Sequence, residues 1–168
     1  QTLCVPCANR CRYCLLSWDG RLPGADYERC KAYARRFYEW LQANRPDLSF
    51  QFYFGFSMEH PALTDAIDFM GSIGSAGGHF LQLDGLSFRH GAQTADFLSE
   101  LKAHGIQTVN LTFYGLADYH DRFAGRQGDF DYLMAILRTA LSLGLEVTAG
   151  APLTRENAGQ AEALASLL

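Results

Sequence analysis

Residues 92–115 read AQTADFLSELKAHGIQTVNLTFYG. In the first half, Phe97, Leu98 and Leu101 fall on one face at helical spacing, which predicts a helix over 92–103. Gly105 is a typical stop signal for such a helix. The second half, 106–114, reads as a short strand. The stretch therefore predicts a helix, a glycine turn and a strand in close succession.

The same order recurs on both sides of this stretch. Further helices are predicted over 26–44, 61–75 and 130–143 and from Asn157 onward, and further strands over 49–56, 79–83 and 145–153. This alternation predicts an α/β fold with a parallel sheet and helices outside it. Periodicity alone leaves open whether the sheet is doubly wound or a barrel. In both cases the functional groups are expected at the carboxyl ends of the strands.

Composition narrows the class of protein. Of the 168 residues, 48% are hydrophobic and 19% charged, which fits one folded domain spanning 1–168. The net charge is −4 and no run of Lys or Arg occurs, so we expect no nucleic-acid partner. No segment reads as a membrane span or a signal peptide, and we expect a cytoplasmic protein. The chain opens on Gln1 and stops within a predicted helix, so we expect it to be a fragment.

Cysteine use is uneven along the chain. Four of the five cysteines lie in the first fourteen residues, namely Cys4, Cys7, Cys11 and Cys14, and Cys30 is expected as a buried thiol on a helix. Clustered thiols without a secretory signal favour metal binding over disulfides. Thiolates are the usual ligands of iron–sulfur clusters, and three of them leave one iron of a [4Fe–4S] cluster without a protein ligand. Such an open position suits a bound substrate.

The spacing Cys7-x3-Cys11-x2-Cys14, with Tyr13 before the last cysteine, resembles the CxxxCxxC signature of the radical S-adenosylmethionine (SAM) superfamily. The resemblance implies a [4Fe–4S] cluster on these three cysteines, with Tyr13 near the cofactors. It also implies a partial (β/α)6 TIM-like barrel, of which about five βα units are visible and the C-terminal part is missing.

Other readings of the cysteines remain open. Cys4, Cys7, Cys11 and Cys14 together could hold zinc, or an iron–sulfur group, in a non-catalytic module, although zinc sites usually have a longer loop between ligand pairs. The bacterial ferredoxin spacing does not match this order. A redox CxxC would explain one pair of cysteines and leave the other unused.

The resemblance extends to residues 57–61, Ser-Met-Glu-His-Pro, where the family carries a GGE-P-like motif after its second strand. It implies that Glu59 holds the ammonium group of SAM, because an ammonium needs acceptors for its protons. Ser57 and Met58 depart from the family's glycines and bring a Cβ where glycine allows close approach. Alternatively, Glu59 is a carboxylate that complements a helix N-terminus.

Residues 110–157 are similar to the peptide-modifying and molybdenum-cofactor-type branches of the family. The likeness implies that Thr112 contacts the SAM carboxylate and that Arg122 or Arg126, otherwise exposed loop charges, supplies the cation. His120 and Asp121, in the charged loop expected after Gly115, read as a loop-bracing hydrogen bond or as an acid–base pair.

Asp84 and Gly85 follow the strand 79–83. They read as a turn or as part of an active-site lining.

The reaction that the resemblance implies begins with SAM bound to the open iron. One electron from a flavodoxin- or ferredoxin-type donor cleaves SAM to methionine and a 5′-deoxyadenosyl radical, which abstracts hydrogen from the substrate. The substrate is not readable from the sequence, and a peptide or protein is favoured by the likeness over 112–157.

Overall fold

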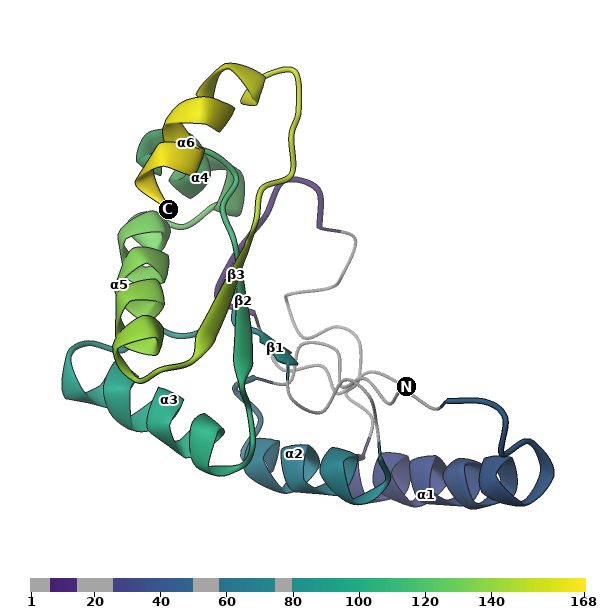
Figure 1. The fold of residues 1–168 in the computed structure, drawn as a ribbon. Helices are drawn as coiled ribbons and strands as arrows, with labels where there is room; N and C mark the ends of the chain where they lie inside the picture. Colours follow the sequence, from purple (N-terminus) through teal and green to yellow (C-terminus); the bar gives the residue numbers. More distant parts are fainter. Residues whose placement is uncertain (1–6, 15–25, 50–57, 75–79) are drawn as a thin grey trace.

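The computed structural model describes residues 7–14, 26–49, 58–74 and 80–168 (Figure 1). The elements are α1 (Tyr27–Asn44), α2 (Leu63–Ser72), β1 (Phe80–Gln82), α3 (Ala92–Ala103), β2 (Thr108–Thr112), α4 (Ala117–Ala124), α5 (Asp129–Ser142), β3 (Glu146–Gly150), the 3-10 turn η1 (Ala158–Gln160) and α6 (Ala161–Leu167). The protein is α/β, with a small open parallel sheet in the described part of the chain.

The sheet has the order β1-β2-β3, and both strand pairs are parallel. Leu81 lies opposite Val109, and Val109 lies opposite Val147. Parallel neighbours need a crossover connection. Here α3 connects β1 to β2, and α4 and α5 connect β2 to β3, so the predicted alternation of strands and helices is confirmed for residues 80–150.

The two faces of the sheet differ in polarity. Leu81, Val109 and Leu111 are buried on the face that α3 and α5 cover (Figure 1). The opposite face carries Gln82 and Asn110, which are half-buried, and Thr148, which is exposed. Parallel sheets usually bury apolar residues on both faces. The polar face departs from this pattern, and such a departure is typical of a face with a functional role.

The long helices lie where the sequence predicts them. Apolar spacing gives α1, α3 and α5 within a residue of their expected bounds, with a glycine stop after α3 and after α5 and the turn residues 44–47 after α1. Cys30 on α1 is buried, as expected. The predicted strand 49–56 and Cys4 lie outside the described residues, apart from Ser49.

One expectation is wrong: the charged loop after Gly115 contains the helix α4. The helix ends at Gly125, which adopts the left-handed conformation with φ 65°. Glycine takes this conformation without the strain that a Cβ brings, and it is the common end of a helix. The buried residues of α4, which fasten it to the rest of the fold, are Tyr119, His120, Asp121 and Ala124.

None of the helices among the described residues is long and apolar enough to cross a membrane.

Candidate functional site

The cysteine loop, residues 7–14, is held to the fold by backbone hydrogen bonds. Ala8 N donates to Gly85 O at 2.9 Å, immediately after β1. Arg10 N donates to Ala124 O at 2.6 Å and Arg12 N to Phe123 O at 3.0 Å, at the end of α4. The loop therefore lies at the carboxyl edge of the sheet, where parallel α/β folds gather their functional groups.

The three loop cysteines, Cys7, Cys11 and Cys14, are all half-buried, and none of the three is in a disulfide. Cys14 N donates to Cys11 O at 3.0 Å, which closes a turn. Burial raises the pKa of Cys7 and of Cys11 above the ordinary thiol value, and the neighbouring loop thiols add to this rise.

Gly85 makes room for the first of these cysteines. Its φ is 69°, which disfavours any residue with a Cβ. A Cβ built on Gly85 would overlap the Sγ atom of Cys7. Both the conformation and the space at this position therefore require glycine.

In the described ranges, no three His, Cys, Asp or Glu side chains converge closely enough to hold one metal ion. A [4Fe–4S] cluster takes each thiolate on a different iron, so its three sulfurs need not converge on a point. The donor set fits such a cluster, because three half-buried thiols lie on one short loop and the absence of a Cβ at Gly85 lets the Cys7 sulfur pack there.

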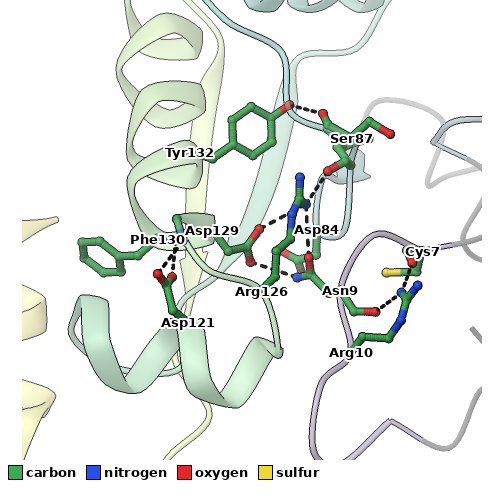
Figure 2. A network of polar contacts seen from close by, with 12 residues as sticks. Cys7, Asn9, Arg10, Asp84, Ser87, Asp121, Arg126, Asp129, Phe130 and Tyr132 are labelled. Carbon is green, nitrogen blue, oxygen red and sulfur yellow. Dashed lines mark hydrogen bonds and ion pairs between the residues drawn. The ribbon is translucent and has the colours of Figure 1, made fainter.

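A buried polar network anchors the middle of the cysteine loop (Figure 2). Asn9 Nδ2 donates to Asp129 Oδ2 at 2.9 Å. His120 Nε2 lies 3.1 Å from the same oxygen, and Arg126 Nη1 donates to Asp129 Oδ1 at 3.3 Å. Asn9, His120 and Asp129 are each at most 4% exposed. The network joins the loop to α4 and to the first turn of α5.

His120 and Asp121 do not form a pair with each other. His120 contacts Asp129, while Asp121 accepts hydrogen bonds from Gly128 N at 2.6 Å and Phe130 N at 2.9 Å. Asp121 thus satisfies free N–H groups at the start of α5. The loop-bracing reading of His120 agrees with these contacts, and its carboxylate partner comes from nine residues further along the chain.

Tyr13, Tyr114 and Cys11 form a second chain of contacts. The hydroxyl oxygens of Tyr13 and Tyr114 are 3.0 Å apart, and Tyr114 OH lies 3.5 Å from Cys11 Sγ. Tyr114 is 4% exposed, and burial raises the pKa of its hydroxyl above the ordinary tyrosine value. Tyr13 is 58% exposed, so the ring before the last cysteine presents much of its surface to solvent.

Thr112 lies at the carboxyl end of β2 and is tied to β1. Its N–H donates to Asp84 Oδ1 at 2.8 Å, and its hydroxyl oxygen accepts from Gln82 Nε2 at 3.0 Å. Gln82 also donates to Asp84. Burial raises the pKa of Asp84 despite these hydrogen bonds. Asp84 and Gly85 thus form the turn that the sequence predicts, and Asp84 also braces β2.

Glu59 forms an ion pair that the sequence does not indicate. Its Oε1 accepts from Arg89 Nη1 at 2.9 Å and from Ser87 N at 2.8 Å, and its Oε2 accepts from Arg89 Nη2 at 3.0 Å. Burial opposes ionisation, but these hydrogen bonds prevail and lower the pKa of Glu59. Glu59 and Arg89 also line a small pocket of about 150 Å³ between α2 and α3.

The two candidate cations differ. Arg126 is turned inward: it also donates to Asn9 Oδ1 at 3.2 Å and to Leu86 O, and its guanidinium lies 3.6 Å from the ring centre of Phe88. Arg122 is exposed in the last turn of α4. The structure gives Arg126 a bracing role and leaves Arg122 accessible.

Sequence reasoning missed Asp129 and Arg89. Asp129 is one of two acidic residues in the first turn of α5, and that position alone indicates a charge that complements the helix dipole. Arg89 has no local signal, because its partner lies thirty residues earlier. Only the folded chain brings either residue to its partner.

Comparison with protein-family models gives no match, and comparison with curated protein sequences gives none either.

Proposed function

We propose that this chain is a radical SAM enzyme that holds a [4Fe–4S] cluster through Cys7, Cys11 and Cys14. The observation that carries the proposal is the position of this loop at the carboxyl edge of a parallel sheet, fastened to Gly85 and to the end of α4. When bound, such a cluster supplies the electron that cleaves SAM reductively for hydrogen abstraction from a substrate.

The finer architecture belongs to the same proposal. We propose that the described sheet is part of a (β/α)6 TIM-like barrel, with α3 and α5 outside and the polar face inside. Gln82, Asn110 and Thr148 on that face suit a polar ligand better than an apolar core. A peptide or protein is the substrate class that we favour, with a flavodoxin- or ferredoxin-type protein as electron donor in the cytoplasm.

The chain's own groups suit the three polar parts of SAM. The Thr112 hydroxyl and Arg122 are proposed for the carboxylate, and Glu59 for the ammonium, which shares this carboxylate with Arg89. The exposed ring of Tyr13, next to Cys14, offers a surface for the adenine. Arg126 supports the site from behind through Asn9.

The test compares four single variants, Cys4→Ser, Cys7→Ser, Cys11→Ser and Cys14→Ser, with the parent chain. Each protein is reconstituted anaerobically with iron and sulfide and assayed for iron, zinc, sulfide and deoxyadenosine release. We expect Cys4→Ser to match the parent, because a fourth thiolate would occupy the iron that SAM needs. The other three variants should lose deoxyadenosine release.

The rival function is a non-catalytic module that holds zinc through all four cysteines. In that case removing any ligand opens a closed tetrahedral site, and all four variants lose metal alike. Equal metal loss from Cys4→Ser and Cys7→Ser would overturn the proposed function.

A further inference from the structure

We infer that Asp129 is a positioning residue for the cysteine loop, and that it fixes the loop in the chain before any cluster is bound. The step from a fixed loop to a correctly seated cluster rests on the proposed function. The fixing itself is argued without the cluster, from the contacts of Asp129 with Asn9 and Arg126 (Figure 2) and with His120.

The first argument is the hydrogen-bond inventory of the Asp129 carboxylate. At 1% exposure its oxygens depend on protein donors. Those donors come from three places: Asn9 in the loop, His120 on α4 and Arg126 between α4 and α5. A single buried carboxylate therefore joins the cysteine loop, α4 and the turn between α4 and α5.

The second argument is the direction of the His120 hydrogen bonds. Tyr114 N donates to His120 Nδ1 at 3.1 Å, so Nδ1 is an acceptor and Nε2 carries the proton that points to Asp129. Since Tyr114 lies two residues after the end of β2, His120 links the carboxyl end of the central strand to the loop anchor. His120 thereby fixes the position of the cysteine loop relative to the sheet.

The third argument is that the Asn9 amide is held at both ends. Its Nδ2 donates to Asp129, and its Oδ1 accepts from Arg126, which also holds Leu86 O after β1. An amide bound on both sides has one orientation and one position. Asn9 lies between Cys7 and Cys11, so this clamp acts in the middle of the longer gap between ligands.

The test measures loop detachment directly. In the 168-residue chain, the amides of Ala8, Arg10 and Arg12 bond to Gly85 O, Ala124 O and Phe123 O, and they exchange with solvent only when the loop leaves the fold. Their hydrogen exchange is followed by NMR without iron. The β2 amides report on global opening.

Two variants disrupt the contact between Asn9 and Asp129, one at each partner, and a third variant is the control. Asp129→Asn places an amide N–H₂ against a donor in either orientation, facing Asn9 and His120 or facing Arg126. Asn9→Ala removes the loop side and leaves the contacts of Asp129 with His120 and Arg126. Asp131→Asn changes an exposed carboxylate on the same helix. We expect the loop amides to exchange about tenfold faster or more in both clamp variants, with β2 unchanged in Asn9→Ala and no effect in the control.

Unchanged loop amides in both clamp variants would overturn the inference. If Asp129→Asn loosens the whole protein, Asn9→Ala decides: acceleration confined to the loop supports the inference, and equal acceleration of loop and β2 refutes it. Iron and sulfide content after reconstitution of the parent tests the proposed function separately. A parent chain that binds no iron ends that proposal and leaves the exchange result standing.

Discussion

At the scale of single residues, the structure contains two versions of the same ion-pair geometry. Glu59 and Arg89 form a two-pronged pair whose side chains are 24% and 22% exposed. Arg45 and Asp47 form a similar pair on the surface, with side chains 51% and 61% exposed. Partial burial strengthens the first pair, whereas water screens the second.

Glu59→Gln is expected to lower the free energy of unfolding at pH 7 by about 1–2 kcal/mol, because charge-assisted hydrogen bonds to Arg89 and Ser87 N are lost. The folded-state pKa of Glu59 lies below its ordinary value of 4.5. Its stabilisation is therefore complete above that pH and disappears as the pH falls through the folded value. The difference in free energy of unfolding between the parent and Glu59→Gln should therefore shrink as the pH falls, and urea unfolding from pH 7 to pH 3 measures it.

Asp47→Asn is the matched control, and we expect no measurable change in stability at any of these pH values. The assignment is wrong if the gap between the parent and Glu59→Gln stays constant down to pH 3, or if Asp47→Asn has the same effect.

At the scale of helices, strands and turns, the sequence predicts what local spacing encodes. Helices α1, α3 and α5 follow from apolar periodicity, and Gly105 and Gly144 mark the ends of α3 and α5. The sequence does not predict helix α4, because its eight residues have no clear apolar periodicity and Gly125 is equally typical of a loop. The spacing of Cys7, Cys11 and Cys14 is enough to single out the cysteine loop as a candidate site. The anchor between Asn9 and Asp129 does not follow from spacing, because 120 residues separate the partners and no local pattern encodes such a contact.

The turn at Gly85 gives a prediction at this scale. Gly85→Ala should destabilise the fold and reduce iron uptake, because the new Cβ overlaps Cys7 Sγ and pushes the loop outward. Gly144→Ala is the matched control: its φ is 70° against 69° for Gly85, and the nearest atom to an added Cβ is Lys102 Nζ at 3.5 Å, an ordinary van der Waals distance. Left-handed strain costs both variants about 1–2 kcal/mol.

Urea unfolding and iron per chain after reconstitution separate the two effects. We expect both variants to have a lower free energy of unfolding than the parent. Gly85→Ala should also bind less iron per chain than Gly144→Ala. Equal iron contents in the two variants would show that the close packing of Cys7 against Gly85 does not affect iron binding.

At the scale of the whole molecule, burial is uneven. Eight of the fourteen residues of α5 are buried, but only three of the eighteen in α1. Figure 1 shows α1 and α2 at one end of the molecule, away from α4 and α6. The cysteine loop is fastened to the well-buried part, through α4, α5 and the turn after β1. The candidate site therefore rests on the region where unfolding should cost most.

Hydrogen exchange at rising urea concentrations tests this distribution. The central strand β2 has both neighbours in the described sheet, and Val109 and Leu111 are fully buried, so its amides and those of α5 should exchange only through global unfolding. Amides of α1 should exchange through local opening, at a free energy lower by about 2 kcal/mol or more.

Ile136→Val, in the buried face of α5, should lower the protection of β2 and α5 together by about 0.5–1.5 kcal/mol. The same substitution should leave α1 unchanged, because α1 opens without the rest. Protection of α1 equal to that of α5, or a matching loss in α1 after Ile136→Val, would mean that the chain unfolds as one unit.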